Sequence, residues 1–220
     1  MKRKLSEPFE AILFDMDGVI IDSEPICRTV IAAMLKDRGH VVSVELQNQY
    51  VGRKTSEMWA DFITTFDLAE PVSALTAQSD NQYLELIKHS EMQPISGLIP
   101  LLDYFQSLNK KMIVASSATA YNIHLVLDKF ALSHYFEGHV SSDEVKQAKP
   151  NPDIFLLAAK KLGVNPTDCL VIEDSRNGIL AARAAGMSSV GYQNPHSGNQ
   201  DLQLADAVVH SLSEIIALVN

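Results

Sequence analysis

The sequence predicts an α/β fold, a doubly wound parallel sheet into which a helical segment is inserted. Three observations support this prediction. Short apolar runs recur along the chain, helical patterns separate them, and one long interval contains helical patterns only. Strands that alternate with helices are typical of a parallel sheet with helices on both faces.

The apolar runs are short and show no alternation of polar and apolar residues. Four clear runs occupy residues 11–14, 112–115, 169–172 and 188–192, and a weaker run lies at 205–209. A strand buried on both faces has this pattern, whereas a strand with one exposed face alternates. We therefore expect these runs to be strands of a parallel sheet that is covered on both sides.

Helical periodicity fills the spaces between these runs. Apolar residues three or four positions apart mark one helix face, and they recur at Leu98, Leu101, Leu102, Phe105 and Leu108 and at Ile154, Leu157, Ala158 and Leu162. Gly163 follows the second pattern and is a typical helix stop. The alternation of strands and helices therefore predicts a Rossmann-like core.

The interval from about Ser23 to about Gln93 breaks this alternation. It contains no convincing strand but several helix-like segments, the first of which runs from around Pro25 to a stop at Gly39. An inserted helical subdomain is the simplest explanation.

Proline and glycine mark both ends of this interval, in the stretches DSEP and QPISG. We therefore assign residues 1–22 and 94–220 to the α/β core domain and residues 23–93 to the inserted helical domain. Asp22 and Ser23 are interpreted as caps of the helix that begins near Pro25.

Composition and charge limit the classes of partner. A chain of 220 residues with 46% hydrophobic content can bury the core of one domain, with or without a smaller insert. The formal net charge of −9 argues against nucleic acid and membrane surfaces, because both attract a basic face. We therefore expect neither partner, and an anionic substrate would need locally placed cations.

The sequence also carries a prediction of location. The start MKRKLSEPFE lacks the apolar segment of a secretory signal, and no apolar run approaches the ~20 residues that span a bilayer. The two cysteines, Cys27 and Cys169, are far apart and have no metal-ligand spacing, so neither a disulfide framework nor a zinc site is indicated. We expect a cytoplasmic protein.

Polar residues directly follow three of the predicted strands. Ligands of an open parallel sheet bind beyond the carboxyl ends of its strands, so these residues are candidates for a site. They are Asp15 and Asp17, Ser116 and Ser117, and Glu173, Asp174 and Ser175. Lys149 adds a cation in the stretch KPNP, which leads into a helix that starts at a proline.

The acidic residues of this set indicate a metal ion. If the chain stays extended at residues 15–17, Asp15 and Asp17 point to the same face, and Asp174 arrives from another strand end. Carboxylates that share a cleft raise each other's pKa unless a cation lies between them. Mg²⁺ prefers oxygen ligands and commonly accompanies phosphate, so we expect Mg²⁺ here.

The remaining groups suit a phosphoryl ligand. Lys149 offers a positive charge, Ser116 offers a hydroxyl donor, and backbone N–H groups around Asp17, Gly18 and Ser117 can line an anion site. Once Mg²⁺ and lysine neutralise the phosphate oxygens, a carboxylate can attack phosphorus and form an aspartyl phosphate. A second aspartate can then transfer protons.

Four motifs in this order resemble the haloacid dehalogenase-like (HAD) phosphohydrolases, in the branch of phosphoglycolate phosphatases, sugar phosphatases and β-phosphoglucomutase. They are DMDGVIIDSE, IVASSA, the lysine of KPNP, and VIEDS followed by NGILAARAAGM. The resemblance covers nearly the whole chain. It implies Asp15 as the nucleophile, Asp17 as the general acid/base, and Ser116 and Lys149 as the residues that hold the phosphoryl group.

The resemblance also implies a ligand set for Mg²⁺. Asp15, the backbone carbonyl of Asp17, and Asp174 would bind the ion, and Glu173 would bind it directly or through water. Because adjacent side chains diverge in an extended segment, we expect only one of Glu173 and Asp174 to reach the metal directly, and we choose Asp174.

The inserted helices resemble the small cap of this family, which closes over the substrate. The stretch VGRKT matches a loop that meets the leaving group, so Gly52, Arg53 and Lys54 are candidates for specificity, although either cation can instead be a solvated surface charge. The predicted substrate-binding residues are thus Gly18, Gly52, Arg53, Lys54, Ser116, Ser117 and Lys149.

Two departures from relatives narrow the expected activity. Dehalogenases of this superfamily lack the second aspartate, so Asp17 favours chemistry at phosphorus. Sugar phosphomutases of this branch usually carry histidine where this chain has Cys27, which favours hydrolysis. We expect a Mg²⁺-dependent phosphatase of sugar phosphates or phosphoglycolate-like compounds that is a monomer or a weak dimer. A phosphomutase is the alternative, and a non-enzymatic binding protein is a third hypothesis.

Overall fold

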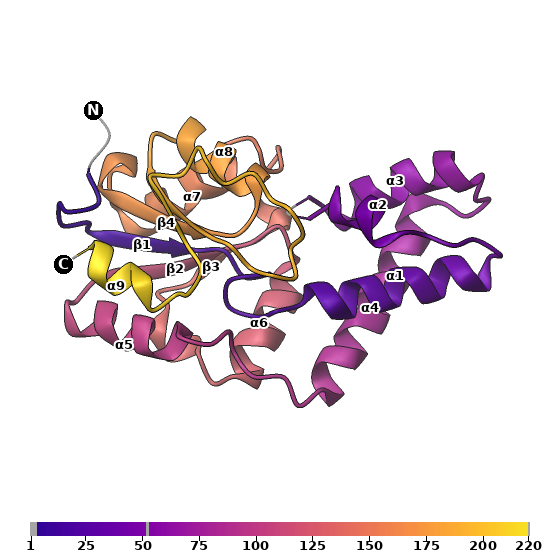
Figure 1. Ribbon diagram of the computed structural model, residues 1–220, viewed down its shortest axis with the longest axis horizontal. Helices are drawn as coiled ribbons and strands as arrows, with labels where there is room; N and C mark the ends of the chain where they lie inside the picture. The colour runs from indigo at the N-terminus through magenta and orange to yellow at the C-terminus, as the bar shows by residue number, and fades with distance from the viewer. Residues whose placement is uncertain (1–3, 52, 220) are drawn as a thin grey trace.

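The computed structural model describes residues 4–51 and 53–219, in which six strands form one parallel sheet (Figure 1). The strands lie in the order β3-β2-β1-β4-β5-β6 and are all parallel. Their bounds are β1 (Ala11–Phe14), β2 (Lys111–Ala115), β3 (His139–Val140), β4 (Cys169–Glu173), β5 (Ser188–Tyr192) and β6 (Ala207–Val209). The predicted α/β fold class is confirmed.

Five of the six strands coincide with the apolar runs of the sequence. The weak run at 205–209 shortens to the three residues of β6. The sequence analysis missed β3, because this edge strand has only two residues and leaves no pattern to detect.

Helices cover both faces of the sheet. On β1, Ile12 and Phe14 belong to one apolar cluster, whereas Ala11 and Leu13 belong to the other. The first cluster includes residues of α5 (Leu98–Ser107), α6 (Ala120–Lys129) and α9 (Glu214–Leu218); the second includes residues of α7 (Asp153–Leu162) and α8 (Arg176–Ala184). Figure 1 shows these two groups on opposite sides of the strands. Burial on both sides explains why the strands are continuously apolar.

The order of the strands reverses beside β1. From β1 the chain moves outward through β2 to β3 and then returns to β4, which pairs with the other edge of β1. Phe14 pairs with Ile172, so the residues that follow β1 and β4 leave the sheet next to each other. A switch point of this kind opens a crevice at the carboxyl ends of the strands, where ligands bind.

Four helices occupy the interval in which the sequence predicts an insert. They are α1 (Glu24–Asp37), α2 (Val44–Asn48), α3 (Thr55–Phe66) and α4 (Val72–His89), and Figure 1 shows them as a group beyond the carboxyl ends of the strands. Three short 3-10 helices, η1 (Ser133–Tyr135), η2 (Ser142–Glu144) and η3 (Pro166–Asp168), lie elsewhere in the chain. The assignment of residues 23–93 to a separate domain stays a prediction.

Aromatic side chains pack α3 against Tyr50, which follows α2, and join it to α4. Phe62 is fully buried and makes edge-to-face contacts with Tyr50, Trp59 and Phe66, at centroid distances of 5.1, 5.9 and 5.5 Å. The indole N–H of Trp59 donates to the hydroxyl of Ser79 at 2.9 Å. Pairs of this geometry contribute beyond the area they bury, so these aromatic residues form the packing centre of the helical segment.

The interpretation of Asp22 and Ser23 as helix caps is wrong for their side chains. Ser23 occupies the N-cap position of α1, but its φ and ψ of −81° and −19° are already helical, and its side chain makes no capping bond. The hydroxyl instead donates to the buried carboxylate of Asp17 at 2.6 Å. Asp22 Oδ2 lies 2.5 Å from His196 Nδ1. A buried carboxylate thus recruits the hydroxyl of Ser23, and the half-exposed imidazole of His196 contacts Asp22.

In the described part of the chain, none of the helices combines the length and apolar character that crossing a membrane would require.

Two apolar residues of α5, one buried and one partly exposed, test how this helix packs against the sheet. Leu102 is fully buried, whereas Ile99 on the same helix is 37% exposed. Leu102→Ala should lower the free energy of unfolding by about 2–5 kcal/mol, because it leaves a cavity against the sheet. Ile99→Ala should lower it by less than about 1 kcal/mol. Urea unfolding followed by circular dichroism measures both, and equal losses would contradict this packing.

Candidate active site

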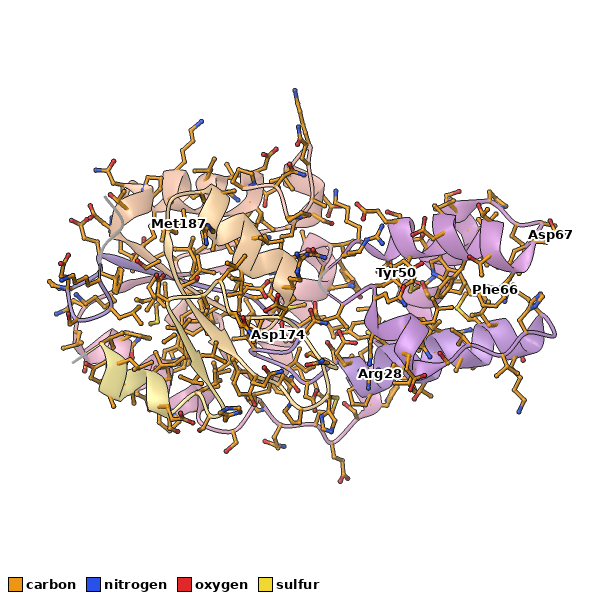
Figure 2. All side chains as sticks on the ribbon, turned by 45° about the horizontal axis from the view of Figure 1, so that its top comes forward. Arg28, Tyr50, Phe66, Asp67, Asp174 and Met187 are labelled. Atoms are coloured by element: carbon orange, nitrogen blue, oxygen red, sulfur yellow. The ribbon has the colours of Figure 1, made fainter. Side chains whose placement is uncertain are left out.

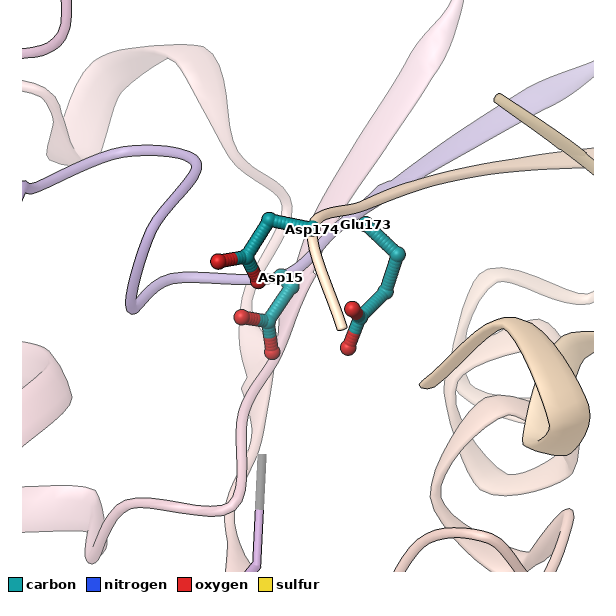
Figure 3. Close-up of side chains that lie close together, drawn as sticks. All are labelled: Asp15, Glu173 and Asp174. Carbon is teal, nitrogen blue, oxygen red and sulfur yellow. The ribbon is translucent and has the colours of Figure 1, made fainter. Parts of the chain in front are cut away.

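Three carboxylates converge at the switch point between β1 and β4. Asp15 follows β1, Glu173 ends β4 and Asp174 follows it, and all three are buried (Figure 3). One oxygen of each side chain lies within 4.8 Å of an oxygen of the other two. The backbone N–H of Asp15 donates to the carbonyl of Ile172 at 3.0 Å, so the ladder of the sheet fixes this convergence.

The expectation that Glu173 and Asp174 diverge is wrong. Both contribute an oxygen to the cluster with Asp15, because the strand ends at Glu173 and the chain turns before α8. Their surroundings nevertheless differ. Glu173 Oε1 accepts from Lys149, and Glu173 Oε2 accepts from the backbone N–H and the hydroxyl of Ser175 at 2.6 and 2.8 Å.

Lys149 lies among these carboxylates. Its ammonium nitrogen is 2.5 Å from Asp15 Oδ1 and 2.8 Å from Glu173 Oε1, and it also donates to the carbonyl of Ala115 at 3.3 Å. The side chain is 1% exposed, so these contacts take the place of water. The structure therefore brings the lysine of KPNP to the acidic residues that follow β1 and β4.

Two glycines make room for the cluster. Gly18 has a φ of +83°, and a Cβ atom there would overlap the carboxylate of Asp174. A Cβ atom at Gly178 in α8 would overlap the carboxylate of Glu173. Both positions therefore require glycine, the first for its backbone conformation as well as for space.

Burial and mutual repulsion shift the pKa values of the acidic groups. The pKa of Asp15 is raised to about 8, because burial and the charge of Glu173, which raise it, outweigh the charge of Lys149, which lowers it. Burial, Glu173 and Asp15 likewise hold the pKa of Asp174 well above its ordinary value. Burial disfavours the charged form of Lys149, but Asp15 and Glu173 outweigh it, so its pKa is raised.

This set of donors fits a divalent cation. One ammonium group cannot balance three carboxylates, and in a buried site the remaining negative charge is unfavourable. A hard divalent ion with oxygen ligands supplies the missing positive charge. The described residues can therefore hold such an ion beside Asp15 and Asp174.

The carboxylate of Asp17 has other partners. Its Oδ1 accepts from the hydroxyl of Ser23 at 2.6 Å and from that of Tyr83, in α4, at 3.4 Å. Burial raises the pKa of Asp17, and the hydrogen bonds from Ser23, Tyr83 and Ser116 lower it. Asp17 thus lies between the sheet and the helical segment, and donors from both surround it.

A cavity of about 340 Å³ separates the sheet edge from α1–α4. Asp15, Asp17 and Ser117 line it on the side of the sheet, and Arg53 and Lys54 line it on the side of the helices. Ser116 and Lys149 are buried behind this surface. Of the predicted residues, five line this cavity: Asp15, Asp17, Arg53, Lys54 and Ser117. Gly18, Ser116, Lys149, Glu173 and Asp174 are not among its lining residues, and Gly52 lies outside the described residues.

Arg53 and Lys54, the two predicted specificity residues on this side, already have partners. Arg53 pairs with Glu57 at 3.1 Å and with Asp61 at 3.5 Å, and its guanidinium lies 5.0 Å from the centre of the Tyr50 ring. Lys54 donates to the carbonyl of Ser142, on the side of the sheet, at 3.2 Å. A role in binding the leaving group stays a prediction for these two residues.

The sequence analysis missed functional neighbours in the loop after β5. Asn194 donates from its amide to the carbonyl of Gly18 at 3.0 Å, and the hydroxyl of Ser197 donates to Asp174 Oδ2. Both side chains are almost fully buried. The signal was available, because the polar stretch QNPHSGN follows a predicted strand as the other candidate residues do.

Comparisons with known proteins show similarity over most of the chain. The family model for haloacid dehalogenase-like hydrolases matches residues 9–186. The fructose-1-phosphate phosphatase YqaB of Escherichia coli (strain K12) is 33% identical over 186 residues, which cover 84% of this chain and 96% of that protein.

Two further proteins extend the comparison. A probable pseudouridine-5′-phosphatase of Drosophila melanogaster is 29% identical over 220 residues, covering 97% of this chain and 94% of that protein. The structure of β-phosphoglucomutase from Clostridium difficile has a TM-score of 0.83 at 28% identity and covers 94% of this chain and 92% of that one.

The raised pKa values predict an unusual dependence of stability on pH. A carboxyl group with a raised pKa binds more protons in the folded state than in the unfolded state. The metal-free protein should therefore lose stability as the pH rises from about 4 towards 8, the interval between the ordinary pKa of Asp15, 3.8, and its folded value of about 8. Glu24 and Asp80, with pKa values raised by burial to about 7 and about 6, act in the same direction.

Urea titrations in EDTA at several pH values measure this effect. Asp15→Asn should give a shallower decline, because one titrating group is gone. A free energy of unfolding that rises through this interval would contradict the account of the cluster.

Proposed function

The chain belongs to the haloacid dehalogenase-like hydrolases and is a phosphatase of that family. We propose that it hydrolyses small phosphorylated metabolites, that the reaction depends on Mg²⁺, and that it passes through an aspartyl phosphate on Asp15. The observation that carries this proposal is the buried contact of Lys149 with Asp15 and Glu173 beside Asp174, next to a cavity that Asp15 lines. It combines a nucleophile, a fixed cation and a set of metal ligands in one place.

Asp15 is proposed as the nucleophile. Lys149 occupies one side of its carboxylate, at Oδ1, and a carboxylate oxygen forms the new bond to phosphorus while the bond from phosphorus to the leaving oxygen breaks. The ammonium group, charged because its pKa is raised, also attracts the phosphoryl oxygens. Ser116, buried next to Ala115 at the end of β2, offers its hydroxyl to the same group.

Asp17 is proposed as the general acid and base. Its raised pKa favours the protonated form, which can give its proton to the leaving oxygen. The resulting carboxylate then takes a proton from water as that water attacks phosphorus and releases Asp15. Ser23 and Tyr83 hold the carboxylate during both steps, because each donates a hydrogen bond to it.

Asp15 and Asp174, with the backbone carbonyl of Asp17, are proposed to hold Mg²⁺, which supplies positive charge beside the phosphoryl oxygens when bound. Both oxygens of Glu173 already have donors, so we propose that Glu173 acts through Lys149 or through water. We therefore propose that Asp174, and not Glu173, binds Mg²⁺ directly.

The cavity wall favours a sugar as the leaving group. Gln47 is buried in α2, and its carbonyl oxygen has no hydrogen-bond partner among the described residues. Glu24 and Asp80 also line the cavity on this side, and Asp143 lines it from η2, beside the cations Arg28, Arg53 and Lys54. Sugar hydroxyl groups can donate to such acceptors, whereas the ionised carboxylate of a phosphoglycolate-like compound has no hydrogen to donate. The name of the Escherichia coli relative, a fructose-1-phosphate phosphatase, supports the same choice.

A phosphomutase remains the second candidate, because the Clostridium difficile protein that this fold matches is a β-phosphoglucomutase. Cys27 lines the cavity, and burial holds the pKa of its thiol well above the ordinary value, so it cannot replace a histidine in proton transfer near neutral pH. This favours hydrolysis. A mutase would convert hexose 1-phosphate to the 6-phosphate without release of phosphate, and a phosphate assay separates the two activities.

Residues 23–93 are proposed to act as a cap that closes over the substrate, and residues 1–22 and 94–220 as the catalytic core. Asp17 and Lys54 support this proposal, because both make contacts between the two parts. The cytoplasmic location and a monomer or weak dimer stay predictions.

Phosphate release from a panel of sugar phosphates, phosphoglycolate and p-nitrophenyl phosphate tests the proposed function. Turnover should require Mg²⁺, and Asp15→Asn should lower it by roughly 10⁴-fold or more, because the nucleophile is lost. Asp67→Asn is the matched control, since Asp67 is exposed at the far end of the helical segment (Figure 2) and asparagine tolerates its left-handed conformation. Activity that persists in EDTA and in Asp15→Asn would refute the proposal.

A second experiment tests the choice of sugar phosphates. Gln47→Leu should lower kcat/KM for sugar phosphates by about 10-fold and change that for p-nitrophenyl phosphate by less than about 2-fold, because only the sugar hydroxyl groups use the amide oxygen. Its free energy of unfolding should not fall, since a buried unpaired polar atom is removed. Gln49→Leu, at an exposed position beside α2, should leave both substrates unchanged. Equal losses on both substrates in Gln47→Leu would contradict the assignment.

A further inference from the structure

The loop of residues 193–198, which follows β5 and is called the bridging loop below, supports the acidic cluster from behind. The hydroxyl of Ser197 donates to Asp174 Oδ2, and the amide of Asn194 donates to the carbonyl of Gly18. Asn194 also accepts from the backbone N–H of His196 at 2.8 Å, which fixes the turn of the loop. Ser197 is fully buried and Asn194 is 2% exposed.

The same loop contacts the helical segment. Arg28, in α1, donates from its guanidinium to the carbonyl of His196 and to the side-chain oxygen of Asn48, the latter at 2.6 Å. The imidazole of His196 lies 2.5 Å from Asp22, just before α1. Gly198 has a φ of +73°, and a Cβ atom there would lie 2.6 Å from the amide nitrogen of Asn48. The loop is therefore packed between the cluster and the helices.

We infer that the bridging loop couples the position of the helical segment to the affinity of the metal site. Ser197 and Arg28 act as positioning residues: Ser197 fixes the carboxylate of Asp174, and Arg28 fixes the loop that carries Ser197. The inference rests on the proposed Mg²⁺ site and goes beyond it, because neither residue belongs to the cluster.

The geometry explains how Ser197 acts. Asp174 Oδ2 lies between the hydroxyl of Ser197 and the backbone of Gly18, where a side chain of any other residue would overlap it. One oxygen of the carboxylate is thus held, and the rotation of the other is restricted. Partners of this kind behind a metal ligand typically change metal affinity by about 10–100-fold.

The geometry also explains how Arg28 acts at a distance. The carbonyl of His196 and the hydroxyl of Ser197 belong to adjacent residues. The hydrogen bond from Arg28 to the carbonyl of His196 therefore also restrains the hydroxyl of Ser197. If the helical segment moves away, this restraint is lost. Coupling of this kind is reciprocal, so metal binding should in turn favour the position of the helical segment in which Arg28 contacts the bridging loop.

Calorimetric titration of the metal-free full chain with MgCl₂ tests the first link. Ser197→Ala should weaken Mg²⁺ binding by about 10-fold. Ser189→Ala is the matched control, because Ser189 is equally buried in β5 and its hydroxyl has no partner among the described residues. It should bind Mg²⁺ as the wild type does.

The second link is tested in the same way with Arg28→Ala, which should weaken Mg²⁺ binding by about 5-fold. Simple electrostatics predicts the opposite, since the loss of a positive charge near an acidic site favours a cation. Arg38→Ala removes a charge from the C-terminal end of the same helix, where Arg38 pairs with Glu70, and should not weaken binding. Arg28→Gln replaces Arg28→Ala if the latter does not fold.

The outcomes separate this inference from the proposed function. A wild-type protein that binds no Mg²⁺ would overturn the proposed metal site and the inference with it. A wild-type protein that binds Mg²⁺, with Ser197→Ala and Arg28→Ala equal to it, would overturn the inference alone. Weakening in Ser197→Ala but not in Arg28→Ala or Arg28→Gln would refute the coupling to the helical segment.

Discussion

The excess of buried negative charge at the ends of β1 and β4 constrains the rest of the molecule. Asp15, Glu173 and Asp174 share a space in which Lys149 provides the one buried positive charge among the residues that the structure describes. In such surroundings carboxylates either bind protons or require a cation, and each alternative has a different consequence. Protonation stabilises the metal-free fold, whereas a divalent ion keeps the carboxylates charged and therefore reactive. The same interaction thus connects folding to catalysis.

The surrounding structure is organised to sustain this charge. Backbone and hydroxyl donors of Ser175 satisfy Glu173, Ser197 satisfies Asp174, and Gly18 and Gly178 leave the space that the carboxylates occupy. The sheet contributes rigidity, because strand ladders fix where each acid leaves it. A group of like charges reduces stability, and here it is confined to a few residues while both faces of the sheet remain tightly packed with apolar side chains.

The proposed chemistry and the proposed selection of substrate come from different parts of the chain. The sheet edge carries the acids and Lys149, whereas α1–α4 carry residues that line the other side of the cavity. Asp17 connects the two, since a donor from α4, Tyr83, reaches its carboxylate. The bridging loop makes a second connection on the opposite side of the cluster, between Asp174 and Arg28. The helical segment therefore contacts both the residue proposed as the acid/base and the loop beside the proposed metal site.

The sequence by itself determined five of the six strands and the candidate acids that follow them. Short apolar runs that alternate with helical patterns are typical of strands buried on both sides, and polar residues at their ends meet at one edge of a parallel sheet, so Asp15 and Asp174 could be found without coordinates. Lys149 was found in the stretch KPNP, before a predicted helix. Tertiary structure alone decided the rest: the turn that brings Glu173 and Asp174 together, the recruitment of Ser23 by Asp17, and the contacts of Ser197. These depend on buried charges that attract donors from distant segments, and such contacts follow no periodicity along the chain.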